Sequence, residues 1–386
     1  MQQTLGRIAS CLGATIALGA LASAAPGQAV TATVTCWELN TTGQTGYNGI
    51  AADVTLLRHS ANFVYPKSSG VPAYSIGPWP GNPNTPSNQN WTFKISKNPV
   101  ASTGNGTATA LGVIGILVNG VPFFNALDAM SYQNENTWHQ NAMFFEAQSF
   151  DACKGHPAPG GVYHPHQNPI CLDDSDGSTH SRIIGFGFDG YPIYGPYGYA
   201  GTDGSGGIAR VATSYRKRNM TTRTTLPDGT QLPANLYGPA VNATYPLGAY
   251  IEDYEYVAGL GGLDEDNGRF CVTPDYPNGT YAYFATIDAA GGTVYPYLIG
   301  PRYHGVVTAG NTGPGGGHVT PTDSPVTFTG GACPADGNHD RVVDGTDLSS
   351  LLSNWGDGGG AGDINRDGVV DGMDMAMILS DWGSCD

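Results

Sequence analysis

Short apolar runs and apolar–polar alternation mark the middle of the chain and predict β-strands. Residues 91–95 contain Trp-Thr-Phe-Lys-Ile, the period of a half-buried strand. Residues 111–118 and 121–124 are apolar runs separated by Asn119-Gly120, and Asn-Gly adopts the positive φ angles of a tight turn. The pattern therefore predicts a β-hairpin there, further strands over 182–188, 269–272 and 280–287, and a modest helix only over 128–150.

Composition agrees with a fold dominated by strands. Charged residues make up only 12% of the 386 residues, while the chain contains 57 Gly, 27 Pro and 21 Tyr, which favours strands joined by many turns. We expect a mainly β body over residues 30–311, built as an antiparallel β-sandwich or jelly-roll-like stack.

Two acidic segments near the C-terminus, 336–347 and 363–374, repeat at a spacing of 27 residues. Each has oxygen-bearing side chains at loop positions 1, 3, 5, 9 and 12, and position 7 adds a backbone carbonyl. A calcium ion requires six or seven oxygens at short range, which such a loop supplies. The spacing predicts two calcium sites, formed by Asp336, Asn338, Asp340, Val342, Asp344 and Asp347 and by Asp363, Asn365, Asp367, Val369, Asp371 and Asp374.

An apolar segment with helical spacing follows each loop, at 348–355 and 375–382, and Trp-Gly ends both. These two loop–helix repeats resemble a type I dockerin. The resemblance implies a small α-helical, tandem calcium-loop domain at 333–386 that docks onto a cohesin-like domain or another cell-surface component. The alternative is that calcium only folds this region and no partner exists.

The repeats depart from that family at two places. Arg341 stands where loop position 6 normally has Gly, because the backbone turns sharply there, which predicts a weaker first site. Positions 10 and 11 are Gly345-Thr346 and Gly372-Met373 rather than Ser-Thr, so the identity of the partner does not carry over.

The N-terminus has the pattern of an export signal. Arg7 precedes a weakly apolar run over 8–25, and Ala22-Ser23-Ala24 is an A-x-A cleavage site, with Ala29 as a second candidate. We expect residues 1–29 to be a signal peptide, the mature chain to lack a membrane span, and the protein to be secreted or associated with the cell surface.

Six cysteines remain after this segment, and an even number in an exported chain indicates disulfides. Six cysteines allow fifteen pairings, which the sequence alone does not resolve. Their positions suggest Cys153 with Cys171 and Cys333 with Cys385, which leaves Cys36 with Cys271.

Charge is unevenly distributed along the chain. The formal net charge is −16, and residues 333–386 carry eleven Asp against two Arg, a net of −9. With so few basic residues, nucleic acid is a poor partner, and divalent cations are a better one. Residues 312–332 contain too few apolar side chains to pack, which predicts a flexible linker.

Histidines cluster in the segment between Cys153 and Cys171. In an extended backbone His164 and His166 point to the same side, and His156 can return across the Pro-Gly turn to meet them. Three neutral imidazoles suit copper, zinc or iron. His180 lies close in sequence and joins the predicted transition-metal site, while Glu146, His139 and His304 are more distant candidates; the alternative is a set of structural histidines in a Tyr-rich core.

Longer motifs surround these histidines. Tyr163-His164-Pro165-His166, the segment 180–196 with Asp189-Gly190-Tyr191-Pro192, and the segment 268–284 resemble the YHYH-domain family. The resemblance covers residues 110–305 and implies a shared fold and site rather than a defined reaction. Pro165 stands where the second Tyr of the family name would be, so any role of that Tyr is absent here.

Together these features predict a secreted metal-binding protein, with a histidine site holding copper or zinc in a YHYH-like body and a calcium-dependent dockerin-like tether. The alternative is a polysaccharide-acting or carbohydrate-binding extracellular protein, because dockerins commonly carry such cargo. No P-loop or dinucleotide fingerprint is present, and the acidic residues show no diagnostic glycosidase pattern, so catalysis is left undecided.

Overall fold

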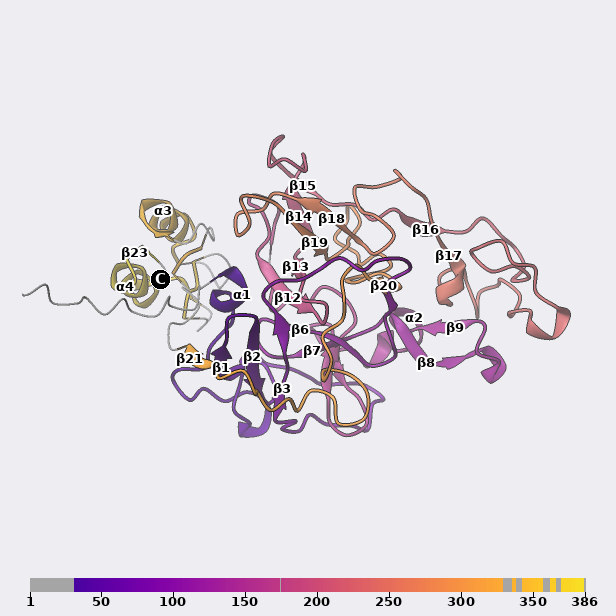
Figure 1. Ribbon diagram of the computed structural model, residues 1–386, viewed down its shortest axis with the longest axis horizontal. Coiled ribbons are helices and arrows are strands. Elements are labelled where there is room, and N and C mark those ends of the chain that lie inside the picture. The colour runs from indigo at the N-terminus through magenta and orange to yellow at the C-terminus, as the bar shows by residue number, and fades with distance from the viewer. Residues whose placement is uncertain are drawn as a thin grey trace, which may run out of the picture.

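A computed structural model describes residues 31–173, 175–328, 335–337, 342–356, 362–365 and 369–384. The predicted signal peptide over 1–29 lies outside the described residues. Figure 1 shows the two larger sheets in the middle of the molecule, helices α3 and α4 at one end, and strands β16 and β17 towards the other.

The first large sheet is formed by the N-terminal part of the body together with one late strand. Its order is β21-β1-β2-β3, and β4 also pairs with β2. Neighbouring strands in this sheet are antiparallel. Its strands are β1 (Val54–His59), β2 (Phe63–Ser68), β3 (Trp91–Thr92), β4 (Ile95–Ser96) and β21 (Val326–Phe328).

The second large sheet has six strands in the order β18-β19-β13-β12-β6-β7. All of its pairs are antiparallel except β13 with β19. The predicted hairpin is confirmed, since β6 and β7 flank Asn119-Gly120 and Gly120 has a φ of 79°. The strands are β6 (Val113–Leu117), β7 (Pro122–Phe124), β12 (Ile183–Gly187), β13 (Pro192–Tyr194), β18 (Gly268–Cys271) and β19 (Thr280–Phe284).

The other strands of the described residues form two-stranded sheets: β5 (Thr107–Ala108) with β20 (Arg302–Tyr303), β8 (Leu127–Ser131) with β9 (His139–Asn141), β10 (Gly155–Pro157) with β11 (Tyr163–Pro165), β14 (Tyr197–Tyr199) with β15 (Ile208–Arg210), β16 (Tyr215–Lys217) with β17 (Tyr254–Tyr256), and β22 (Val342–Val343) with β23 (Gly383–Ser384). The helices are α1 (Ala32–Thr35), α2 (Ala142–Phe145), α3 (Gly345–Ser353) and α4 (Gly372–Ser380), and the 3₁₀ turns are η1 (Tyr47–Gly49), η2 (Tyr132–Asn134), η3 (Ala147–Ser149), η4 (Ala234–Leu236) and η5 (Ile251–Asp253).

One hydrophobic core joins the two large sheets. Leu57 and Ile95 of the first sheet and Ile116, Phe186 and Tyr283 of the second are all buried in the same cluster. Every residue of β12 is buried, as expected for a central strand without polar alternation. The predicted mainly β, largely antiparallel body is therefore confirmed, while its description as a sandwich or jelly roll stays a prediction.

The predicted helix over 128–150 is wrong in most of its length. The segment forms the β8–β9 pair and η2, and only α2 and η3 near its end are helical. Gln133, Asn134 and Asn136 have φ angles of 53°, 61° and 51°. A left-handed backbone interrupts a right-handed helix, and Asn tolerates it better than most residues do.

The predicted linker over 312–332 is also wrong for its described part. β21 pairs with β1, and the segment before it runs beside β3, where Thr92 donates to the carbonyl of Gly317 and Val319 donates to that of Thr92. A segment poor in apolar residues can still be ordered, because backbone hydrogen bonds to a sheet need no particular side chain. Residues 329–332 lie outside the described part of the chain.

Candidate functional site: a buried histidine and glutamate cluster

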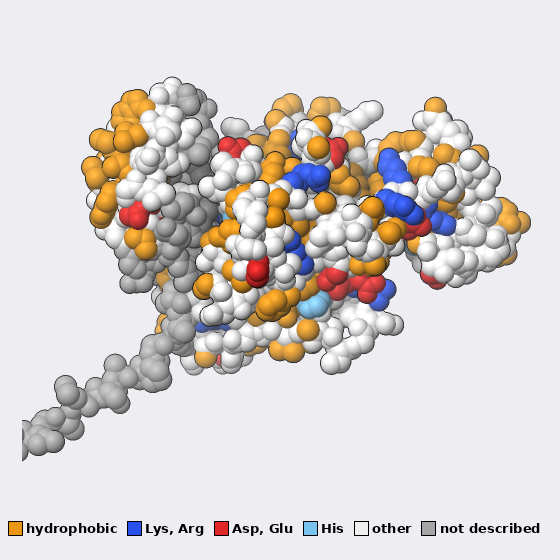
Figure 2. All heavy atoms as spheres, turned by 90° about the horizontal axis from the view of Figure 1, so that it is seen from above, with side chains coloured by type: hydrophobic (Ala, Val, Ile, Leu, Met, Phe, Trp, Pro, Cys, Tyr) orange, Lys and Arg blue, Asp and Glu red, His pale blue; other side chains and the backbone are white. Residues whose placement is uncertain are grey.

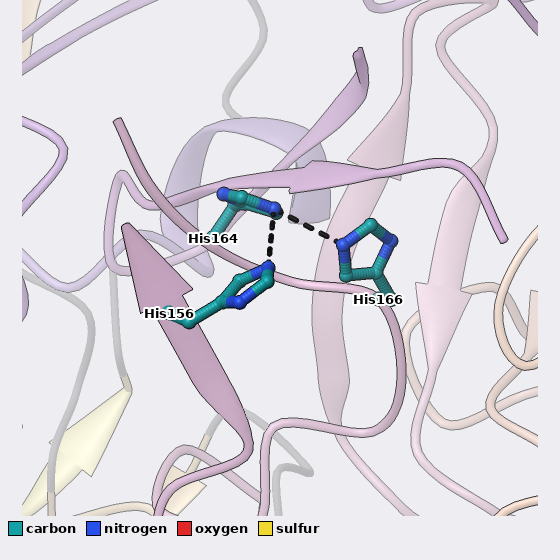
Figure 3. A group of neighbouring side chains, drawn as sticks. All are labelled: His156, His164 and His166. Atoms are coloured by element: carbon teal, nitrogen blue, oxygen red, sulfur yellow. Dashed lines mark hydrogen bonds between the residues drawn. The ribbon is translucent and has the colours of Figure 1, made fainter. Parts of the chain in front are cut away.

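The β10–β11 pair positions two of the three predicted histidines. His156 of β10 lies directly opposite His164 of β11, and side chains of directly opposed residues project from the same face. His166 follows His164 by two positions and therefore projects from the same side of the extended chain. The three imidazoles meet at one point, as Figure 3 shows.

The converging atoms are the three Nε2 nitrogens. His164 Nε2 lies 3.1 Å from His156 Nε2 and 3.1 Å from His166 Nε2. For metal–nitrogen bonds of about 2.0–2.1 Å, nitrogens at this separation subtend an angle of about 100° at the ion. This angle lies between those of octahedral and tetrahedral coordination, so the spacing suits a single metal ion.

Glu146 adds a carboxylate oxygen to the cluster. It follows α2, and its Oε2 lies 3.1 Å from His166 Nε2 and 3.5 Å from His156 Nε2. Burial would raise the pKa of Glu146, but the facing His166 and His156 outweigh this and lower it. Oε2 is buried without a hydrogen bond of good geometry in the described structure. A buried carboxylate oxygen without such a partner is costly, and a metal ion at the cluster would satisfy it.

The opposite nitrogen of each ring is held by an oxygen atom. His164 Nδ1 lies 3.0 Å from the carbonyl oxygen of Val162, and His166 Nδ1 lies 2.6 Å from that of Asn125. A carbonyl oxygen only accepts hydrogen bonds, so Nδ1 carries the proton in both rings and the neutral rings present a lone pair at Nε2.

Ser149 fixes the third ring in the same way. Its hydroxyl donates to the carbonyl of Glu146 at 2.8 Å, so it must accept from His156 Nδ1, which lies 2.6 Å away. In its neutral form, each of the three rings therefore directs a lone pair at the common point. This is the arrangement by which oxygen partners behind a histidine orient it toward a metal.

Burial disfavours protonation of two of the three rings. Burial, and then the charge of His166, lower the pKa of His156 to about 4. Burial and the two neighbouring rings lower the pKa of His164 well below its usual value. His156 and His164 therefore stay neutral at ordinary pH, and their nitrogen lone pairs, 3.1 Å apart, repel one another unless a cation lies between them.

Aromatic rings enclose the cluster. Phe124 stacks on His164 with ring centroids 3.6 Å apart, and Phe150 meets the His156 ring edge-on at 4.6 Å. The three histidines are buried, whereas the side chain of Glu146 keeps 29% of its surface exposed. Glu146 is therefore the residue of the cluster with the most contact with solvent, although its Oε2 is buried.

Asp151 and a disulfide brace the hairpin from behind. Asp151 Oδ2 accepts hydrogen bonds from Tyr163 Oη and from Trp79 Nε1, at 3.0 and 3.1 Å. The predicted pairing of Cys153 with Cys171 is confirmed, and this disulfide closes the segment that contains all three histidines. Both constraints limit how far the rings can move apart.

His180 does not join the cluster, so its inclusion in the predicted metal site is wrong. Its Nδ1 donates to the carbonyl of Ser181, and its ring packs edge-on against Tyr194 and Tyr199. The chain beyond Cys171 leads into the six-stranded sheet, which carries His180 into the aromatic core instead.

The more distant candidates had different outcomes. Glu146 reaches the cluster, whereas His139 binds Glu252 through Nδ1 at 2.6 Å. His304 lies with Asp264 and Asp266 in a separate, half-buried group. Ser149 and the carbonyls of Asn125 and Val162 were not predicted, because no side-chain pattern in the sequence marks an oxygen atom that orients a histidine ring.

The other predicted cysteine pairs fare differently. Cys271 is a buried thiol whose pKa is raised by burial, so its predicted pairing with Cys36 is wrong. Its strand, β18, is held in the six-stranded sheet by pairing with β19, whereas Cys36 follows α1 near the N-terminus of the body. Cys333 and Cys385 lie outside the described residues.

The C-terminal repeats have matching local structures. Asp344 caps the N-terminus of α3 and Asp371 caps that of α4, and each side chain accepts a hydrogen bond from the backbone N–H two residues later. In return, the side chains of Asp347 and Asp374 accept from the backbone N–H of Asp344 and Asp371, respectively. Asp336, Val342, Asp363, Asn365 and Val369 are also described, while Asn338, Asp340 and Asp367 lie outside the described residues. The predicted calcium sites therefore stay a prediction.

The fold and the cluster define a mainly β protein with a buried group of three histidines and one carboxylate. The family model described as YHYH protein matches residues 92–293, which include the whole cluster and its hairpin. The chain belongs to this family. No curated protein and no solved structure matches the chain. Among the described residues, no helix combines the length and apolar character needed to cross a bilayer.

Proposed function

We propose that the chain is a secreted metal-binding protein whose body holds one transition-metal ion at His156, His164, His166 and Glu146. The observation that carries this proposal is the convergence of three Nε2 atoms, with His164 Nε2 3.1 Å from each of the other two and each Nδ1 facing an oxygen atom. Such a site has no favourable state with all rings neutral and no cation present.

The donor set favours copper or zinc over the hard cations. Calcium and magnesium take oxygen ligands, whereas imidazole suits copper, zinc and iron. Three nitrogens and one oxygen at these separations can also leave a coordination position open, because four protein ligands complete only a tetrahedral site. The side of Glu146 that is open to solvent is the approach for the ion and for any small ligand of the ion.

The C-terminal module is a calcium-dependent, dockerin-like tether in this proposal. The repeated capping geometry at α3 and α4 supports it. A set of apolar side chains on this module is 49% to 65% exposed, and Figure 2 shows hydrophobic side chains gathered over this end of the molecule. An exposed apolar face of this kind suits a protein partner such as a cohesin-like domain. Its members are Leu352, Trp355, Met373, Leu379 and Trp382.

Metal analysis of the purified chain tests the histidine site. After calcium is stripped with a selective chelator, we expect about one copper or zinc ion per chain in the wild type. The double variant His164→Ala, His166→Ala should lose it, while His139→Gln, a histidine outside the cluster, should retain it. Glu146→Gln serves as a second variant, because the side chain is partly exposed and glutamine keeps its size.

These measurements distinguish metal binding by the histidine cluster from a purely structural role of the same residues. A wild-type chain that binds no transition metal after dialysis against copper and zinc would refute it, and so would a double variant that binds as tightly as the wild type. Near-ultraviolet circular dichroism of each variant establishes that its aromatic core is intact before its metal content is compared.

A further inference from the structure

A groove of about 480 Å³ crosses the outward face of the five-stranded sheet, away from the histidine cluster. Its floor is a row of residues on adjacent chain segments: Leu56 of β1 lies opposite Lys67 of β2, and Lys67 lies opposite Thr92 of β3. Thr92 in turn pairs with His318. Arg58 follows Leu56 by two positions and so projects from the same face. The groove thus spans four segments.

The titratable side chains that line this groove are all basic. They are Arg58, Lys67 and His318, in a chain whose 16 Lys and Arg are outnumbered by 32 Asp and Glu. Within the described residues neither Arg58 nor Lys67 forms an ion pair, and Arg58 Nε is buried without a hydrogen-bond partner. The carboxylate of Asp323 accepts from Tyr65 Oη at 2.7 Å and does not line the groove.

A cation that is partly removed from water and left without a counter-charge is costly. Arg58 and Lys67 line the same groove, so their like charges also repel each other. An anion in the groove relieves both costs. The guanidinium fork of Arg58 matches a carboxylate, and Lys67 adds a compact positive charge beside it.

The other residues that line the groove indicate which class of molecule carries the anionic group. Asn90 offers an amide, and Thr92 and Thr320 offer hydroxyls, which hydrogen-bond to sugar hydroxyl groups. Leu56 and Pro321 offer apolar surface for the carbon faces of a sugar ring. We propose that this groove binds an acidic carbohydrate, a sugar chain that carries carboxylate groups.

Several features favour a uronate chain over a simple anion. An inorganic anion would occupy only the two cations and leave the amide, hydroxyls and apolar floor unused. A nucleic acid carries a much denser negative charge than a uronate chain and needs a longer row of basic residues than Arg58, Lys67 and His318 provide. The site does not involve the histidine cluster, so it stands or falls independently of the metal site.

Calorimetric titration of the full chain tests the proposal with short oligogalacturonates, with neutral oligoglucans of equal length, and with inorganic sulfate. We expect the oligogalacturonate to bind at least about tenfold more tightly than either of the others, and its affinity to fall with added salt. The double variant Arg58→Gln, Lys67→Gln should weaken this binding by at least about tenfold.

Two controls make the result specific. Lys217→Gln removes an exposed lysine on β16, outside the groove, and should bind like the wild type. His164→Ala, His166→Ala should also bind like the wild type, because it alters only the metal site. Arg58→Lys keeps the charge but loses the fork, so it should bind more weakly than the wild type and more tightly than Arg58→Gln.

The proposal fails if the double variant binds oligogalacturonate as tightly as the wild type, or if the neutral chain binds equally well. Equal affinity for sulfate would show a general anion site and would overturn the assignment to a carbohydrate. Unchanged thermal unfolding of each variant shows that a loss of binding does not come from a loss of folding.

Discussion

The histidine cluster of the body and the loops of the C-terminal module gather their polar groups in opposite ways. Each loop places its predicted ligands within twelve consecutive residues and leads directly into the helix that it caps. The cluster instead takes His156 and His164 from opposite strands, Glu146 from the end of a helix, and the carbonyl of Asn125 from the residue that follows β7. A contiguous loop encodes most of its geometry locally, whereas the cluster exists only in the folded body. We therefore expect the C-terminal module, and not the body, to need a metal ion in order to fold.

Calcium removal is expected to have the largest effect, and this effect should be limited to the C-terminal module. Among the described residues, a small buried cluster that includes Leu351, Val370 and Ile378 holds α3 to α4, against the repulsion of a net charge of −9 over residues 333–386. We expect both helices to unfold when calcium is chelated while the sheets of the body persist. Far-ultraviolet circular dichroism, followed during titration with a calcium chelator, measures the loss of helix.

A matched pair of variants sharpens this result. Asp371→Asn weakens one predicted calcium loop, whereas Asp228→Asn changes an exposed Asp of the body and should leave the calcium dependence unaltered. Helices that survive complete removal of calcium would show that this module folds without the ion, and the contrast with the body would disappear.

Loss of the disulfide is the next largest effect, and it acts on the body. Cys153 and Cys171 are 18 residues apart, and closing a loop of this length stabilises the folded state by about 3 kcal/mol. The variant Cys153→Ala, Cys171→Ala should lose about this much unfolding free energy, measured by urea denaturation, and should also bind metal more weakly. An unfolding free energy within about 0.5 kcal/mol of the wild type would contradict the prediction.

A smaller change removes one oxygen behind the cluster. Ser149→Ala deletes the acceptor for His156 Nδ1, so the ring is free to change its tautomer and orientation. Such substitutions typically reduce metal affinity by about 10–100-fold, and we expect a loss in this range in a competition titration with a metal-binding dye. Ser205→Ala, which changes an exposed serine of a surface loop, is the control. Equal affinity in both variants would show that the hydroxyl does not position the ring.

The smallest expected effect is a pH dependence of stability that comes from the pairing of His139 with Glu252. The hydrogen bond to Glu252 raises the pKa of His139 against the opposing effect of burial. A raised pKa in the folded state adds stability below the unfolded value of about 6.5, and that stability is lost as the pH rises through the folded pKa. We expect the wild type to lose about 1 kcal/mol or less relative to His139→Gln on going from mildly acidic to mildly basic pH.

Urea unfolding of both proteins at the two pH values measures this difference. Because the other histidines are common to both chains, their titration cancels in the comparison. A constant difference between the two proteins at both pH values would show that the pair with Glu252 does not depend on the charge of His139.

Local patterns predicted the strands around the site but not the course of the chain between them. The hairpin at Asn119-Gly120 and the alternation of His164 and His166 each depend on near neighbours, and both are confirmed. The helix expected over 128–150 fails because Gln133, Asn134 and Asn136 adopt left-handed backbone conformations. The spacing of apolar residues does not reveal such positions, because it depends on the type of side chain and not on the φ angles of the backbone.

The sequence by itself determined that His164 and His166 project from the same side of an extended segment, because this follows from the alternation of side chains along a strand, and it suggested the disulfide that encloses them. Only the tertiary structure decided that Glu146 completes the cluster, that His180 packs in the aromatic core, that Cys271 stays a thiol, and that the segment around His318 joins a sheet. Each of these depends on distances between segments far apart in sequence. Such distances are set by how the sheets pack, and no local pattern records them.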